Sequence, residues 1–197
     1  MRIKKYLSYS QFNTFLSSPK RYKKMYIDGI RLSSKYLSFG SKIATALETR
    51  EKSDDPDIIK ALELIPDVQE KEKEFLVDFE GIPLSGKLDG FEFIDGVYHI
   101  EEDKTGKNPW TQSKVDNAKQ ITFYVIFLWK TYGVKPEDIK VKLRWLETFE
   151  DVDGSIHLTG RVEVFETQRT MKDILNIYPD IKKAWLGIEE LVNSCAK

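Results

Sequence analysis

Residues 86–106 read GKLDGFEFIDGVYHIEEDKTG, and this stretch decides the fold that we expect. Aromatic and β-branched residues recur on both sides of Asp95-Gly96, a dipeptide typical of a two-residue hairpin turn. The pattern predicts two antiparallel strands, over residues 84–93 and 97–103.

Acidic residues lie at matching positions on the two predicted strands. Asp89 lies six residues before Asp95, and Glu102 lies six residues after Gly96. We therefore expect the two carboxylates to be opposite each other across the ladder. Side chains alternate along a strand, so Lys104 shares a face with Glu102. The sequence predicts that Asp89, Glu102 and Lys104 converge on one spot.

This convergence would suit a divalent metal ion. Two facing carboxylates repel each other unless a cation lies between them. Oxygen ligands suit Mg²⁺ or Mn²⁺, and the backbone carbonyl of Asp103 would add a third oxygen. Lys104 would orient or deprotonate an attacking water, or steady the negative charge that develops. These groups fit metal-assisted hydrolysis of a phosphodiester. The alternative is a pair of exposed strands joined only by salt bridges.

Helices are expected before the hairpin, and strands and helices after it. Ser8 and Gln11 form a capping-box pattern, and Ser18-Pro19 is typical of a helix start. The predicted helices cover residues 8–17, 19–27, 35–52, 56–65 and 113–132, and the further predicted strands cover 74–79, 139–149 and 155–165. The tail from residue 167 is predicted to be helical and broken near Pro179. This order indicates an α/β fold, a mixed β-sheet flanked by helices.

Length and composition agree with one folded domain. The chain has 197 residues, of which 41% are hydrophobic and 32% are charged. We divide it into an N-terminal helical part (1–66), a sheet and helix (67–166) and C-terminal helices (167–197). The most apolar run, residues 121–129, is too short to span a bilayer, so we expect no membrane partner. Cys195 is the only cysteine, which excludes an iron–sulfur cluster and favours a reducing, cytoplasmic compartment.

Charge is unevenly distributed along the chain. Residues 1–42 contain ten Lys or Arg and one acid, Asp28, although the net charge of the whole chain is −1. A basic segment on a neutral protein predicts a binding site for a polyanion. The alternative is a solvated helical face. The candidates for phosphate contact are Lys20, Arg21, Lys23 and Lys24, and the candidates for base stacking are Tyr6, Tyr9, Phe12, Tyr22 and Tyr26.

Several short motifs resemble one family of nucleases. They are GKLD (86–89), EDKTG (102–106) and QITFY (120–124), preceded by LSYSQF (7–12) and SPKRY (18–22). In this order they resemble the RecB-like branch of the PD-(D/E)xK nuclease superfamily, which includes phage and CRISPR-associated exonucleases. The resemblance covers about residues 5 to 130.

The resemblance implies a restriction-endonuclease-like core and a role for each matching residue. Asp89, Glu102, Lys104 and Gln120 would be catalytic. The metal ligands would be Asp89, Glu102, the carbonyl of Asp103, and Glu48 on an earlier helix. The substrate contacts would come from Tyr124, Lys20, Arg21, Lys23, Lys24 and Ser10.

Two departures from the family pattern stand out. Ser18 replaces the first cysteine of an iron–sulfur cluster, and Cys195 alone cannot bind one. Ala44 stands where the family often has a histidine ligand, one helical turn before Glu48. Glu48 could replace that ligand directly or through water.

Together these features predict a Mg²⁺- or Mn²⁺-dependent DNA nuclease, with an exonuclease acting on DNA ends preferred. A recombination protein or a helicase would be a further partner. Two alternatives stay open. One is a non-catalytic DNA-binding or recombination accessory protein on the same fold, and the other is a structure-selective endonuclease.

Overall fold

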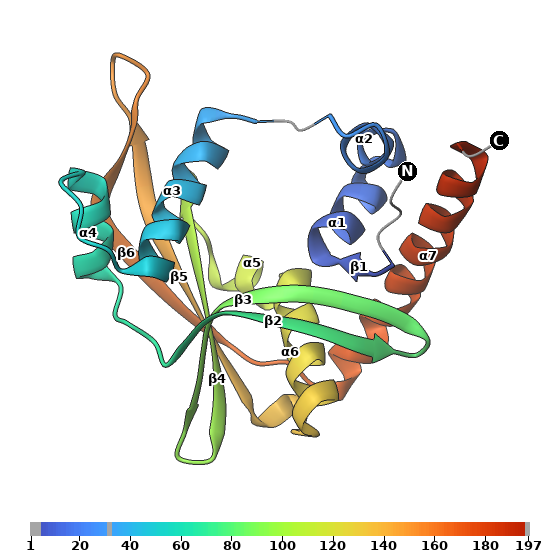
Figure 1. Cartoon of the computed structure of the whole chain (residues 1–197). Helices are drawn as coiled ribbons and strands as arrows, with labels where there is room; N and C mark the ends of the chain where they lie inside the picture. Colours follow the sequence, from blue (N-terminus) through green and yellow to red (C-terminus); the bar gives the residue numbers. More distant parts are fainter. Residues whose placement is uncertain (1–4, 31–32, 196–197) are drawn as a thin grey trace.

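The computed structural model describes residues 5–30 and 33–195, which form a mixed six-stranded β-sheet flanked by helices (Figure 1). This confirms the predicted α/β fold, with the layers of a restriction-endonuclease-like core. The strands are β1 (Leu7–Ser8), β2 (Glu70–Phe79), β3 (Ile82–Ile94), β4 (Val97–Gly106), β5 (Ile139–Glu150) and β6 (Ile156–Thr167). Their order is β1-β3-β4-β5-β6, with β2 also paired to β3. The β1–β3 and β4–β5 pairs are parallel and the others are antiparallel.

Helices cover the sheet in two groups (Figure 1). The helical elements are α1 (Tyr9–Ser17), α2 (Pro19–Tyr22), a π-helical turn (Lys23–Ile27), α3 (Lys35–Thr49), α4 (Pro56–Leu64), α5 (Gln112–Asp116), α6 (Lys119–Tyr132), a short 3-10 turn (Pro136–Asp138) and α7 (Met171–Cys195). The larger core lies between the sheet and α1, α6 and α7. A smaller core joins α3 and α4 to β5 and β6.

The helix starts and the hairpin turn were predicted correctly. The Ser8 hydroxyl accepts a hydrogen bond from the Gln11 backbone N–H, and the Gln11 side-chain oxygen accepts one from the Ser8 backbone N–H, which completes the capping box. Ser18 caps α2 with Pro19 at its first position. At the β3–β4 turn, Asp95 and Gly96 have φ of 51° and 80°. Positive φ at both residues is what a type I′ hairpin turn requires.

The helix predicted over residues 113–132 is wrong in one respect, because it is two helices. Arg169 explains the break between α5 and α6. One of its guanidinium nitrogens donates to the carbonyls of Val115 (2.9 Å) and Ala118 (3.2 Å). The two carbonyls at the end of α5 thus accept hydrogen bonds from a distant arginine, and a new helix, α6, begins at Lys119. The predicted helix over residues 35–52 is also too long, because Arg50 adopts a left-handed φ of 54° and ends α3.

The predicted break at Pro179 is wrong. The helix α7 is continuous from Met171 to Cys195 with Pro179 inside it. A proline removes one helical hydrogen bond and its ring crowds the preceding turn, which costs about 3 kcal/mol. The apolar face of α7 offsets that cost, because Ile174, Ile177 and Ile181 on both sides of the proline are buried in the larger core.

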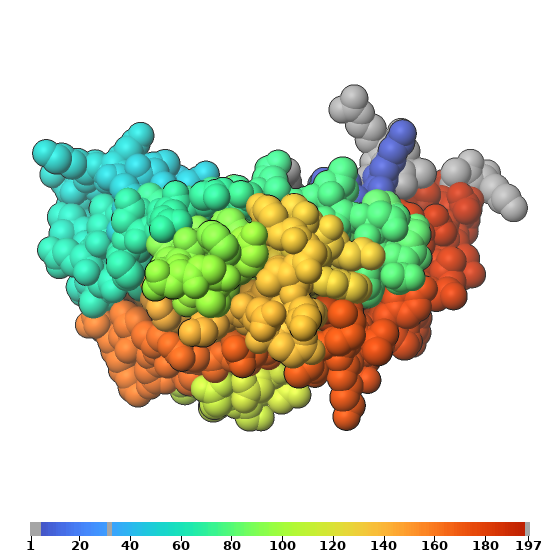
Figure 2. All heavy atoms as spheres, turned by 90° about the horizontal axis from the view of Figure 1, so that it is seen from below, coloured from blue at the N-terminus to red at the C-terminus, as the bar shows by residue number. Residues whose placement is uncertain are grey.

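The underside of the molecule is closed by aromatic packing. Figure 2 shows the tip of the β3–β4 hairpin (lime green) beside the end of α6 (yellow). Tyr98 stacks on Tyr132 with ring centroids 5.1 Å apart, and Phe91 stacks on both. In the part of the chain that the structure describes, none of the helices is sufficiently long and apolar to cross a membrane.

Candidate active site

The hairpin brings Asp89, Glu102 and Lys104 together. Gly90 pairs with Glu101 in the β3–β4 ladder, and Asp89 and Glu102 are the next residues in line. The backbone N–H of Asp103 donates to Oδ2 of Asp89 at 3.2 Å. Lys104 forms an ion pair with Oε1 of Glu102 from the same face of β4. The geometry that the spacing predicted is therefore present.

Helix α6 supplies the next contacts to this cluster. Gln120 donates its side-chain N–H to Oε1 of Glu102 at 2.9 Å, and its amide also bonds the hydroxyl of Tyr124. The two residues are four positions apart, so they share one helix face. Tyr124 is buried, and burial first, then the charges of Glu102 and Asp89, raises its pKa well above the ordinary value. Tyr124 therefore orients Gln120 as a neutral hydroxyl.

The electrostatics of the cluster favour cations. Glu102 is only 1% exposed. Burial, followed by the Glu102 charge, raises the pKa of Asp89 to about 7, although Lys104 opposes the shift. Burial lowers the pKa of Lys104, but the Glu102 carboxylate outweighs it, so the pKa of Lys104 is raised overall. One lysine thus faces two carboxylates, the buried Glu102 and the half-buried Asp89, that repel each other.

One oxygen of this cluster has no hydrogen-bond partner among the described residues. It is Oε2 of Glu102, which is buried. An unpaired buried carboxylate oxygen beside a second carboxylate fits the needs of a hard cation. No group of three Asp, Glu, His or Cys side chains within residues 5–30 and 33–195 is close enough to hold a metal alone. The protein side chains would therefore hold a metal only together with backbone, water and substrate oxygens.

A cavity of about 440 Å³ lies beside the cluster, between α3 and the sheet, where β3 and β4 residues line it. Its lining includes Glu48 and Ala44 of α3 together with Asp89, Asp103 and Lys104. Glu48 is exposed, and its carboxylate lies 3.9 Å from the Lys87 ammonium. The carboxylates of Glu48 and Asp89 thus share one cavity, and Ala44 contributes only a methyl group to it.

The side chain of Asp103 is held away from the cluster by a residue that the sequence did not point out. Arg144 pairs with Oδ1 of Asp103 at 2.7 Å and with Glu101 on the same strand. It is 5% exposed and lines the cavity. The parallel register, with Asp103 opposite Arg144, creates this contact. Only knowledge of the strand pairing could have indicated Arg144.

The predicted substrate contacts on the N-terminal helices lie apart from the cavity. Lys20, Arg21 and Lys24 are exposed on α2 and the turn after it, and Ser10 is exposed on α1. Lys23 is paired to Asp28 at 2.8 Å. Their roles stay predictions. None of these residues lines the 440 Å³ cavity.

The aromatic residues suggested for base stacking differ in how deeply they are buried. Phe12 and Tyr22 are buried in the core. Tyr9 is half-buried, and its ring lies edge-on to Phe123 at 5.6 Å. Burial raises the pKa of Tyr9, and the charges of Lys104 and Lys119 oppose the shift. Tyr9 therefore lies within electrostatic reach of Lys104.

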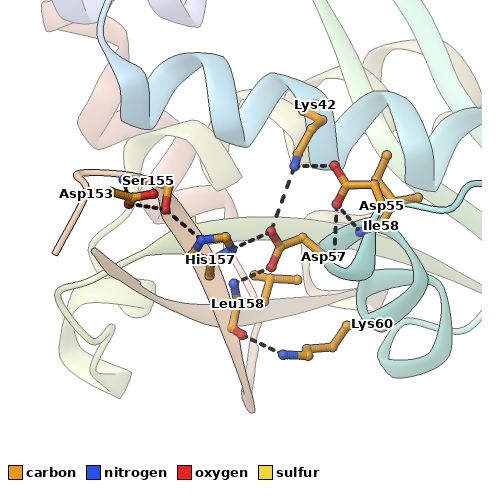
Figure 3. Close-up of polar contacts among 9 residues, drawn as sticks. All are labelled: Lys42, Asp55, Asp57, Ile58, Lys60, Asp153, Ser155, His157 and Leu158. Atoms are coloured by element: carbon orange, nitrogen blue, oxygen red, sulfur yellow. Dashed lines mark hydrogen bonds and ion pairs between the residues drawn. The ribbon is translucent and has the colours of Figure 1, made fainter. Parts of the chain in front are cut away.

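A second polar cluster, in the order serine, histidine, aspartate, holds α4 to β6 (Figure 3). Ser155 Oγ lies 2.7 Å from Nε2 of His157, and Nδ1 of His157 lies 3.0 Å from Oδ2 of Asp57. A serine nucleophile would give its proton to the histidine. Here Asp153 also accepts the Ser155 hydroxyl at 2.6 Å, and a hydroxyl has one proton to donate. Asp57 accepts the Leu158 backbone N–H at 2.8 Å as well. We assign this cluster to the scaffold.

Comparisons with known proteins support the fold. No family model matches the sequence, and no curated protein matches it. Several solved structures resemble the chain, and two crystal structures among them match most of it. SSO0001 is 15% identical with a TM-score of 0.53, covering 94% of this chain and 78% of its own. A protein from Eubacterium rectale, named as a candidate exonuclease, is 13% identical with a TM-score of 0.56, covering 96% of this chain and 80% of its own. At these identities the likeness establishes a shared fold.

Proposed function

We propose that this chain is a metal-dependent DNA nuclease that hydrolyses phosphodiester bonds at DNA ends. One observation carries the proposal. It is the convergence of Asp89, Glu102 and Lys104 on one spot, with Gln120 bonded to Glu102. The fold shared with a candidate exonuclease supports the same reading. The exposed cations of α2 would contact the DNA backbone. The protein would act in the cytoplasm, and its partner there would be a recombination protein or a helicase.

Asp89, Glu102 and the carbonyl of Asp103 would hold Mg²⁺ or Mn²⁺, with Glu48 reaching in from α3. The bound metal would supply a Lewis acid for the phosphate and lower the pKa of its water. Gln120 fixes Oε1 of Glu102, which leaves Oε2 available as a ligand. Arg144 occupies the Asp103 carboxylate, so the contribution of Asp103 would come from its backbone carbonyl.

The raised pKa of Lys104 narrows its role. Because Glu102 keeps the ammonium charged, Lys104 is a poor base at neutral pH in the metal-free protein. Its charge would instead orient the attacking water and stabilise the negative charge that develops on the phosphate. Positioning and electrostatics would then supply most of the rate, as in phosphoryl transfer generally.

The test is digestion of end-labelled linear DNA with Mg²⁺, Mn²⁺ or EDTA. We expect cleavage that needs metal and that is abolished in Asp89→Ala and Lys104→Ala. A circular single strand would separate the two nuclease types, because only an endonuclease cuts a circle. Gln120→Glu should lower the cleavage rate without abolishing cleavage, since it places a further carboxylate against Glu102.

A non-catalytic accessory role is the second candidate. Two observations favour it: Ala44 lacks a metal-binding atom, and the described side chains form no complete metal site alone. DNA binding without cleavage in either metal, unchanged in Lys104→Ala, would support this role and refute the nuclease.

A further inference from the structure

The first turn of α3 exposes an aromatic and an aliphatic side chain beside the candidate active site. Tyr36 is 43% exposed and Leu37 is 61% exposed. Both line the same 440 Å³ cavity as Asp89 and Lys104. An aromatic ring and an aliphatic side chain in the lining of a cavity with charged groups offer both apolar and polar contacts to a ligand.

The Tyr36 ring is held in place before any ligand arrives. Its hydroxyl donates to Oε2 of Glu150 at the end of β5. Lys35 forms an ion pair with the other oxygen of Glu150 and donates to the carbonyl of Gly154 at 3.1 Å. The start of α3 is thus fastened to the β5–β6 turn. A ring ordered in advance loses little entropy on binding.

Lysine side chains lie near the ring, together with the Glu150 carboxylate. The pKa of Glu150 is lowered by the hydrogen bonds from Lys35 and Tyr36, and also by the charge of Lys107. Lys107 is exposed and follows the EDKTG segment directly. Lys35 and Lys104 are ion-paired with Glu150 and Glu102, and the exposed Lys107 adds a further cation beside the apolar surface. That combination binds single-stranded nucleic acid, in which bases stack while phosphates meet cations.

The size of the cavity argues for one unpaired nucleotide. Cavities of about 300–1,000 Å³ hold ligands of small-molecule size. A volume of 440 Å³ therefore holds about one nucleotide, whereas a base pair in a duplex cannot enter without opening.

We propose that Tyr36 and Leu37 form a platform for the base of an unpaired nucleotide whose phosphate lies at Lys104, so that the site takes a single-stranded DNA end. This inference rests on the proposed nuclease function and names its substrate class. The stacking partner is the Tyr36 ring, and Leu37 packs against the edge of the base or its sugar.

The platform is tested by binding, which does not depend on cleavage. Fluorescence anisotropy in EDTA would compare a labelled single strand with a blunt hairpin duplex of the same length. We expect Tyr36→Ala to weaken single-strand binding about tenfold, since stacking contributes about 1–3 kcal/mol per base. Tyr36→Phe keeps the ring and should bind like wild type. Leu37→Ala should show a smaller loss.

Phe93→Ala is the matched control, because Phe93 is a similarly exposed aromatic residue near the end of β3 and does not line the cavity. It should bind both DNAs like wild type. Unchanged single-strand binding by Tyr36→Ala, or an equal loss on the duplex, would overturn the platform. So would a loss in Tyr36→Phe as large as in Tyr36→Ala, since Tyr36 would then act through Glu150.

Cleavage separates a failure of the platform from a failure of the nuclease. If wild type cleaves, Tyr36→Ala should raise KM for the single strand about tenfold and leave kcat within about twofold. A lower kcat with an unchanged KM would count against the platform. If wild type does not cleave at all, the nuclease proposal fails, and the anisotropy comparison still decides the platform.

Discussion

At the residue scale, Asp89 sets the pH behaviour of the metal-free protein. Desolvation, followed by the charge of Glu102, raises the pKa of this half-buried carboxyl to about 7 from an ordinary value of 3.8. A raised pKa means that the folded state holds the proton more tightly than the unfolded chain does. The contribution of the protonated Asp89 to the free energy of unfolding is therefore fully present below about pH 4 and is lost as the pH rises through 7.

The first prediction follows from that sign. In EDTA, wild type should lose stability between pH 5.5 and pH 8.5, and Asp89→Asn should lose less, because it carries no charge to bury. At pH 8.5 Asp89→Asn should be the more stable protein by up to about 4 kcal/mol, at about 1.4 kcal/mol per pKa unit. Urea unfolding at both pH values measures the difference.

Asp54→Asn is the control for this comparison, because Asp54 is an exposed carboxylate. It should follow the wild-type pH dependence. Parallel curves for wild type and Asp89→Asn would show that Asp89 is not buried as described.

The second prediction concerns Ala44, which lines the cavity with Glu48 and Asp89. Ala44→His should add an imidazole ligand and tighten Mn²⁺ binding about tenfold, and Mg²⁺ binding less, because the softer nitrogen favours Mn²⁺. Isothermal titration calorimetry measures both affinities. Thr45→His is the control, since Thr45 is exposed but does not line this cavity. Equal affinities in the two variants would exclude a ligand position at residue 44.

At the element scale, the glycine of the GKLD motif has a packing role. A Cβ atom on Gly86 would lie 2.5 Å from the Phe127 ring, and Phe127 is fully buried in α6. Glycine therefore lets α6 approach β3 closely. Because Gln120 and Tyr124 are on this helix, the same contact determines how far they stand from Glu102.

The third prediction tests that contact. Gly86→Ala should destabilise the protein by about 1–3 kcal/mol, the usual cost of overpacking a core. Adding Phe127→Leu should recover part of the loss, because a smaller side chain clears the space. A double-mutant cycle by urea unfolding measures the coupling. Additive losses would mean that Gly86 is needed for another reason.

At the scale of the whole molecule, the basic N-terminal helices should determine the salt dependence of DNA binding. The fourth prediction is that replacing Lys20, Arg21 and Lys24 by Ala lowers the slope of log K against log salt by about two, at roughly 0.7 per phosphate contact on a single strand. Anisotropy titrations between low and moderate salt measure this slope. Replacing the exposed Lys172, Lys182 and Lys183 of α7 is the control and should leave it unchanged.

Local signals predicted much of the fold. The Asp95-Gly96 turn, the Ser8 capping box and Pro19 act within a few residues, and the structure has all three. The hairpin register also followed from counting outward from its turn. The geometry of Asp89, Glu102 and Lys104 was therefore within reach of the sequence.

Features that depend on distant contacts were not predictable. The break between α5 and α6 depends on Arg169, about fifty residues further along the chain. The two-residue strand β1 exists only because it pairs with Leu84 and Ser85. Arg144 contacts Asp103 because β4 and β5 pair in parallel although a helical segment separates them in the chain. Tyr36 of α3 binds Glu150 of β5, more than a hundred residues later in the chain. No local pattern marks these partners.

The place of α1 has a consequence for synthesis on the ribosome. It follows β1, which pairs with Leu84, and its Phe15 packs against Gly187 of α7. The helix α1 therefore leaves the ribosome well before the partners on which it packs. Until residue 187 is outside the exit tunnel, α1 and the basic segment behind it have no complete surface on which to dock. A nascent chain of this protein would therefore expose the β3–β4 hairpin of the candidate site before α1 could pack in its final place.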